Sequence, residues 1–267
     1  MKYLISASKL LDDLHDYKVV EVTFYDDSYV EWHIPNAIRL PWRYLRHPVK
    51  RDFATREILE KRLGELGISH EDPLVLYSDF NNRYAFYAFW ILRAFGHREM
   101  SVLDGGKVAW EIKEFPRETE VRSRPACKYE ASEPDWSQRI MVWELLPKIN
   151  RGEKFQLLDV RYREEYVGEA STPPEHPNEE SQVTGHIPGA VNVPWNKFFD
   201  PITEELLPPD KLEISVSRDE TVVYCRTGAR ASLVWFYLKY LLNIPRVRLY
   251  DGSWSEWGNM VGVPVER

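Results

Sequence analysis

Cysteine is scarce in this chain of 267 residues, which contains only Cys127 and Cys225. Two thiols are too few for a disulfide framework or for the cysteine clusters that hold structural zinc. We therefore expect neither a disulfide-stabilised fold nor a metal site. Any thiol chemistry must come from one of these two positions.

Long apolar runs and an excess of positive charge are also missing. No segment approaches the roughly 18 apolar residues of a membrane span, and the residues from Met1 to Leu11 lack the apolar core of a signal peptide. The net charge of −7 argues against a general nucleic-acid binder, which is usually basic. With 43% hydrophobic and 29% charged residues, we expect a soluble, cytoplasmic globular protein that binds neither nucleic acid nor membrane.

The sequence repeats itself. Two His-Ile-Pro segments begin at His33 and His186, and two Asp-Gly segments, each followed by a tryptophan, begin at Asp104 and Asp251. The Asp-Gly pair lies 251 − 104 = 147 residues apart and the His-Ile-Pro pair 186 − 33 = 153 residues apart, so the halves differ by a few inserted residues. The order of these landmarks predicts a duplicated domain.

A charged, proline-containing stretch separates the two halves and reads as an exposed linker. We place the N-terminal domain at 1–120, the linker at 121–137 and the C-terminal domain at 138–267. Cys127 falls inside this linker, and we interpret it as an incidental thiol.

Each half alternates short β-branched segments with segments of helical length. This pattern predicts an α/β fold in which each domain has a mostly parallel sheet flanked by helices. In the second half we expect strands at 155–160, 191–193, 221–225 and 247–250. Parallel sheets bind ligands at the carboxyl ends of their strands, which is where Cys225 falls.

Cys225 ends a strand and is followed by a short turn and an apolar, helix-like stretch. Helix N-termini and nearby arginines favour the reactive thiolate form of cysteine. The backbone from Arg226 through Thr227, Gly228 and Ala229 to Arg230 is expected to curl around the sulfur, with Gly228 allowing a positive φ. Both arginines are candidates to bind an oxyanion.

The length of this loop separates two chemistries. Cysteine phosphatases and arsenate reductases place five residues between the cysteine and the arginine, whereas loops that hold a persulfide are one residue shorter. Here four residues separate Cys225 from Arg230, which favours sulfur transfer. The structural alternative is a buried strand-end cysteine that behaves as a small hydrophobic residue.

Asp79 takes the place of Cys225 in the first half when the two halves are matched at 225 − 79 = 146 residues. A carboxylate cannot carry a transferable sulfur. We therefore predict a catalytically inactive N-terminal domain that packs beside the C-terminal one and walls its pocket.

The motifs of the second half resemble those of tandem-domain rhodaneses, a family of thiosulfate sulfurtransferases. Weaker repeats of the same motifs cover the first half. The matching segments lie at 158–161, 185–190, 224–230 and 250–257.

This resemblance implies a double displacement. Cys225 would attack the outer sulfur of thiosulfate, release sulfite and keep a persulfide, which cyanide or a thiol would then accept. The partners would be a small sulfur donor and a thiophilic acceptor, with a protein acceptor as a further option. No cofactor is expected, because the sulfur is carried by the protein.

Within the family, an arginine directly after the cysteine is typical of thiosulfate enzymes, and a glycine of mercaptopyruvate sulfurtransferases, so Arg226 favours thiosulfate. Glu165 stands where vertebrate rhodaneses have a donor-binding arginine. Donor binding must then depend on other groups. The alternatives left open are a 3-mercaptopyruvate sulfurtransferase and a non-catalytic rhodanese-type binding module.

Two further residues are candidates for the pocket, Arg161 and Trp254. For Arg161, a structural ion pair with Asp159 is an equal alternative. His186 is expected to brace the loop before a strand rather than to act as a base. The insert at 168–184 is loop-like and is a candidate lid.

Overall fold

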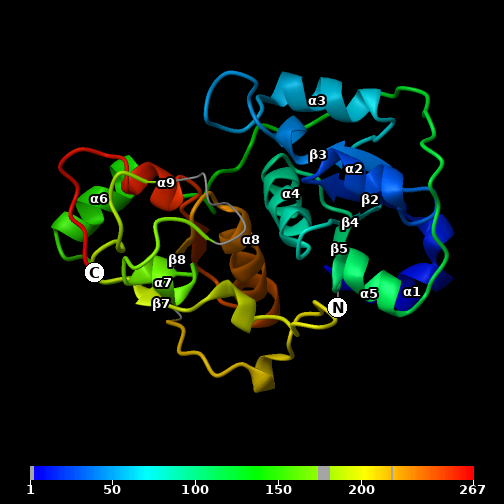
Figure 1. The fold of residues 1–267 in the computed structure, drawn as a ribbon. Helices are drawn as coiled ribbons and strands as arrows, with labels where there is room; N and C mark the ends of the chain where they lie inside the picture. The colour runs from blue at the N-terminus through cyan, green and yellow to red at the C-terminus, as the bar shows by residue number, and fades with distance from the viewer. Residues whose placement is uncertain (1–2, 174–180, 218) are drawn as a thin grey trace. The chain divides into compact units, whose positions relative to one another are not determined.

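The computed structural model describes residues 3–173, 181–217 and 219–267 of the chain (Figure 1). They form two compact units. The first unit comprises Met1–Asp135 and Phe199–Leu206, and the second comprises Trp136–Phe198 and Leu207–Arg267. Each unit is a parallel sheet flanked by helices, which confirms the predicted fold class. No helix within the described residues is both long and apolar enough to cross a bilayer.

The sheet of the first unit has the strand order β1-β5-β4-β2-β3, with every pairing parallel. The central strands β2 and β4 are almost wholly buried runs rich in Val and Leu, as expected for strands covered on both faces. The strands are β1 (Leu4–Ile5), β2 (Lys18–Thr23), β3 (Ile38–Pro41), β4 (Leu74–Tyr77) and β5 (Met100–Leu103).

Five α-helices connect these strands, and α4 lies deepest, with eleven of its twelve residues buried. Its aromatic side chains account for much of the aromatic content of the chain. The helices are α1 (Ala7–Asp12), α2 (Asp26–Glu31), α3 (Arg56–Glu65), α4 (Arg83–Ala94) and α5 (Gly106–Ile112), with 3₁₀ turns η1 (Leu14–Asp16) and η2 (Trp42–Leu45).

The sheet of the second unit has the order β7-β6-β8-β9, also parallel throughout. All four strands lie within the predicted segments. They are β6 (Gln156–Asp159), β7 (Val191–Asn192), β8 (Thr221–Tyr224) and β9 (Val247–Leu249). The helices are α6 (Val142–Asn150), α7 (Arg163–Tyr166), α8 (Ala229–Phe236) and α9 (Ser253–Trp257), with 3₁₀ turns η3 (Trp195–Lys197) and η4 (Pro209–Lys211). Helix α8 continues directly into a π-helical turn, η5 (Tyr237–Leu241).

The two units repeat the same long-range hydrogen bonds. The hydroxyl of Tyr77 accepts the N–H of Ile34 at 3.0 Å, and the hydroxyl of Tyr224 accepts the N–H of Ile187 at 3.1 Å. In the same way, the indole N–H groups of Trp110 and Trp257 donate to backbone carbonyls 2.9 Å away in the segments that follow them. The sequence landmarks therefore mark one structural unit used twice.

Two connecting segments belong to the first unit. The stretch at 121–135 is mostly exposed, but its backbone is tied down: the N–H of Cys127 donates to Gly64 at 3.0 Å, and that of Asp135 to Ala94 at 2.8 Å. The second segment, Phe199–Leu206, lies within the range 138–267 predicted for the C-terminal domain. Its Leu206 N–H donates to the Asp104 carboxylate at 2.8 Å.

Candidate active site around Cys225

Cys225 directly follows the last residue of β8 and is only 1% exposed. Its sulfur accepts the N–H of Gly228 at 3.1 Å, so the chain turns back on the thiol within four residues and enters α8. Gly228 has a φ of 98°, which confirms the predicted left-handed turn. The sulfur thus lies at the N-terminus of a helix whose first N–H groups carry partial positive charge.

A second element holds this loop from the side. The Ser253 hydroxyl accepts the N–H of Cys225 at 3.2 Å and donates to the Tyr250 carbonyl at 2.7 Å. The next N–H groups of α9 donate to the loop carbonyls, from Trp254 to Cys225 and from Ser255 to Arg226, each at 3.0 Å. The start of α9 therefore sets the backbone position of the cysteine.

Ser253 was not among the predicted site residues. The signal for it was the Asp-Gly-Ser segment at 251–253, which recurs near Asp104 but carries Gly106 in the place of Ser253. Ser253 has a left-handed φ of 54°, and so does Gly106, at 51°. A serine in a conformation that favours glycine points to a role for its hydroxyl.

Arg230 is occupied by a carboxylate inside the protein. Its two terminal nitrogens donate to the two oxygens of Glu165 at 2.6 and 2.9 Å, and both side chains are buried. Burial by itself would raise the pKa of Glu165, but the charge of Arg230 and these hydrogen bonds outweigh it and hold that pKa below its usual value. The residue that departs from the vertebrate pattern is thus the partner of the loop arginine.

Arg226 points to the insert at 168–184. Its guanidinium donates to the carbonyl of Ser171 at 2.7 Å and to the hydroxyl of Ser181 at 3.4 Å. The middle of that insert, at 174–180, lies outside the described residues, so the lid remains a prediction. Arg226 connects the described ends of the insert to the cysteine loop.

Arg161 and Trp254 lie together beneath the site. Arg161 makes a forked ion pair with Asp159, at 2.5 to 3.0 Å, donates to the Gly185 carbonyl at 2.6 Å and stacks 4.5 Å from the Trp254 ring. Burial acts to lower the pKa of Arg161, but Asp159 overcomes it and raises that pKa. These contacts support the structural interpretation of Arg161.

His186 also has structural partners. Its Nδ1 lies 2.9 Å from the Tyr166 carbonyl and its ring stacks on that tyrosine at 3.7 Å. His33 makes the matching contacts with Tyr29, at 2.9 and 3.9 Å. Because the two histidines are held alike, only one of them in a unit with a site cysteine, both brace the turn before a strand, as expected.

The strand register corrects the predicted match between Asp79 and Cys225. Tyr77 ends β4 as Tyr224 ends β8, so the residue in the place of Cys225 is Ser78. Asp79 is one residue further along, where its carboxylate accepts the N–H groups of Phe24 and Tyr25 at 3.0 and 3.1 Å. A serine cannot carry a sulfane sulfur either, so the expectation of an inactive first unit is unchanged.

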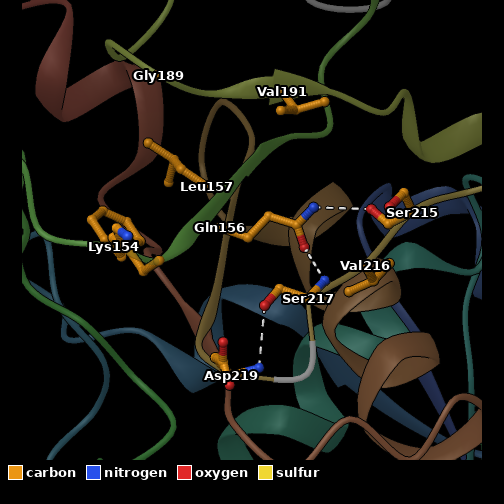
Figure 2. A pocket seen from close by; sticks show the side chains of 10 residues that line it. Lys154, Gln156, Leu157, Gly189, Val191, Ser215, Val216, Ser217 and Asp219 are labelled. Atoms are coloured by element: carbon orange, nitrogen blue, oxygen red, sulfur yellow. Dashed lines mark hydrogen bonds between the residues drawn. The ribbon is translucent and has the colours of Figure 1, made fainter.

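A cavity of about 460 Å³ lies elsewhere in the second unit (Figure 2). Gln156, at the amino end of β6, spans it through hydrogen bonds to the Ser215 carbonyl at 2.9 Å and the Ser217 N–H at 2.6 Å. Because β6 and β8 are parallel, this cavity lies at the opposite sheet edge from Cys225. Among the residues that the structure describes, no cluster of three or more metal-binding side chains is found.

The fold and the site define a tandem α/β protein with one buried thiol at the carboxyl end of a parallel strand. The sequence matches the family described as "Rhodanese-like domain" twice, over residues 6–113 and 143–260. The chain belongs to the rhodanese family.

Relatives extend over the whole chain. It is 42% identical to "Putative thiosulfate sulfurtransferase 1" of Mycobacterium bovis, covering 98% of this chain and 97% of that one. It is 41% identical to "Sulfur carrier protein TtuD" of Thermus thermophilus, covering 99% and 96%. The family and these names support a sulfurtransferase.

Solved structures share the fold. Wild-type EanB matches with a TM-score of 0.86 and 24% identity, over 99% of this chain and 69% of that one. The Tum1 protein from Saccharomyces cerevisiae matches with a TM-score of 0.81 and 24% identity, over 96% and 94%.

Proposed function

We propose that this protein is a thiosulfate sulfurtransferase that carries sulfane sulfur as a persulfide on Cys225. In the first step the Cys225 thiolate attacks the outer sulfur of thiosulfate, the S–S bond of the donor breaks, and sulfite leaves with the bonding electron pair. In the second step cyanide or a thiolate attacks the outer persulfide sulfur, and the Cys225 thiolate is regenerated.

The observation that carries this proposal is the contact between the Cys225 sulfur and the N–H of Gly228, 3.1 Å away at the start of α8. A donor aimed at the sulfur stabilises negative charge there, both in the thiolate and in the persulfide. The loop between strand and helix has only four residues, 225–228. A small ring of this kind favours one sulfur atom over a tetrahedral phosphate, which counts against a phosphatase.

The two loop arginines take different roles in this proposal. Arg226, next to the cysteine, attracts and orients the dianionic donor, and its contacts with Ser171 and Ser181 aim it toward the insert. Arg230 is a positioning residue, because Glu165 binds both of its terminal nitrogens. Arg226 favours thiosulfate over the monoanionic mercaptopyruvate. The "sulfur carrier" name of the Thermus thermophilus relative motivates a protein thiol as one acceptor.

The test is the intact mass of the full chain after incubation with thiosulfate, together with an assay for released sulfite. We expect a gain of about 32 Da, the mass of one sulfur atom, that disappears on adding cyanide. The Cys225→Ala variant should show no gain. The Cys127→Ala variant removes the exposed thiol and should behave like the wild type.

An adduct with mercaptopyruvate but not with thiosulfate would keep the reaction class and change the donor. No adduct with either donor would overturn the enzymatic proposal and favour the non-catalytic binding module. Hydrolysis of an aryl phosphate, lost in Cys225→Ala, would favour the phosphatase instead.

A further inference from the structure

A second cavity in the second unit, of about 330 Å³, carries uncompensated positive charge. We call it the basic cavity. Its polar lining is drawn from the segment before α6, the start of β8, the turn η5 and the start of β9. These residues are Gln138, Glu220, Lys239, Arg246 and Arg248.

Two of the four charged groups neutralise one another. Glu220 accepts hydrogen bonds from Arg248, one of them at 3.1 Å, and lies 3.3 Å from Lys148. Arg248 also pairs with Glu144 at 2.5 Å. The carboxylate of the cavity is therefore already bound by two cations and does not offset the remaining charge.

Lys239 and Arg246 have no carboxylate partner within the described residues. The ammonium of Lys239 donates to the Pro245 carbonyl at 2.7 Å, and partial burial lowers the pKa of Lys239 with no anion to oppose the shift. Arg246 is exposed, and its side chain makes no hydrogen bond or ion pair to any described residue. Two cations are thus left free to bind an anion.

Gln138 adds an unused hydrogen-bonding group. Its side-chain oxygen is shielded from solvent and has no partner among the described residues. Rotation about the last side-chain bond exchanges the oxygen and the NH₂ group, so the amide can donate to an oxyanion. A buried polar group without a partner is costly, and a bound ligand would satisfy it.

The backbone at this place is also unusual. Lys239 lies in the π-helical turn Tyr237–Leu241, and such turns are frequent at functional sites. The cavity is at the lower end of the size range of ligand pockets, which suits a small molecule. A lysine ammonium and an arginine fork together bind phosphate groups well.

We propose that the basic cavity binds a small ligand through a phosphate group, held by Lys239, Arg246 and the amide of Gln138. Free phosphate and small phosphate monoesters share this chemistry. The site uses no residue of the cysteine loop, so it is independent of the proposed function.

The test measures acylation of Lys239 by acetic anhydride, followed by peptide mass spectrometry of the full chain. Inorganic phosphate should slow acylation of Lys239 about fivefold or more at saturation, because a bound anion covers the amine. Lys154, on the cavity of Figure 2, should react at an unchanged rate and serves as the internal control. Acetate at the same ionic strength should not protect Lys239.

Two variants with the same loss of charge sharpen this result. Arg246→Gln, at an exposed position, should weaken the protection by phosphate about tenfold, whereas Lys154→Gln should leave it unchanged. Equal protection of Lys239 and Lys154, equal protection by acetate, or no effect of Arg246→Gln would each overturn the proposal. Glycerol 3-phosphate distinguishes the source: tighter protection than by inorganic phosphate supports an ester, and equal protection supports free phosphate.

Discussion

The loops after β4 and β8 occupy the same place in the two units and differ by one residue. The first runs from Ser78 to Asn82, five residues before α4, and the second from Cys225 to Gly228, four residues before α8. The extra residue in the first loop lets the Asn82 amide oxygen reach the Ser78 N–H at 2.9 Å. In the second loop, Ser253 binds the corresponding Cys225 N–H, and the turn closes on the sulfur.

The missing residue reappears at the other end of the helix. Strands β4 and β8 correspond at 221 − 74 = 147 residues, the helix starts at 229 − 83 = 146, and β5 and β9 again at 247 − 100 = 147. The π-helical turn η5 accommodates one residue more than an α-helical turn would. The shorter cysteine loop is therefore accommodated without shifting the next strand.

The two units also differ in how they compensate a buried carboxylate. Asp159 receives a forked ion pair from Arg161 at 2.5 to 3.0 Å. Glu21, in the matching place beside Tyr77, has Lys107 at 3.4 Å and the Tyr77 hydroxyl at 2.5 Å. Burial outweighs these contacts and raises the pKa of Glu21 to about 7. The first unit thus contains a group that titrates near neutral pH.

Removing the thiol should have the largest effect. In Cys225→Ser the hydroxyl cannot carry a sulfane sulfur, which makes the second loop chemically like the first. We expect sulfur transfer to cyanide to fall at least about a thousandfold, as for loss of a catalytic nucleophile. Thiocyanate formation measures it. The reverse change, Ser78→Cys, should produce no activity in a Cys225→Ser background, because the longer loop does not close on the sulfur. Activity there would contradict the importance of loop length.

Breaking the buried pair behind the second loop should cost stability. Arg230→Gln and Glu165→Gln each leave one buried charge without its partner, which we expect to lower the free energy of unfolding by about 3–5 kcal/mol. Denaturant titration followed by tryptophan fluorescence measures it. The double variant should be more stable than the sum of the two losses predicts. Additive losses would show that the two side chains do not depend on each other.

The pH dependence of stability should distinguish the first unit. Since the native pKa of Glu21 is raised, its contribution is present below its ordinary pKa of 4.5 and is lost as pH rises through about 7. Glu21→Gln resembles the protonated form, so it should gain up to about 3 kcal/mol relative to wild type between pH 4.5 and pH 8. Unfolding at pH 5 and pH 8 measures the difference. A wild type and variant with parallel pH profiles would contradict this assignment, and Glu57→Gln, at a surface position, is the matched control.

The Ser253 hydroxyl should have the smallest effect. Ser253→Ala and Ser253→Gly both remove the acceptor for the Cys225 N–H, at a cost of about 1–2 kcal/mol in stability. Gly tolerates the left-handed backbone and Ala does not, so the alanine variant should be the less stable of the two. Persulfide formation should slow several-fold in both. A wild-type rate in both variants would show that α9 does not position the cysteine.

Much of this arrangement could be predicted from the chain. The duplication, the parallel α/β fold and the position of Cys225 at a strand end follow from local periodicity and spacing. The left-handed turn at Gly228 follows from the residue type. The counterpart of Cys225 was predicted as Asp79 because a shifted loop and a shifted helix cannot be separated without the strand register.

The sequence by itself determined the fold, its repetition and the thiol on the turn, because backbone conformation and burial depend on patterns among neighbouring residues. Only the tertiary structure decided the partners. Glu165 reaches Arg230 across 65 residues of sequence, and Ser253 reaches Cys225 across 28. Such pairs form where packing brings distant elements together, and the charges left without a partner, Lys239 and Arg246, are identified in the same way.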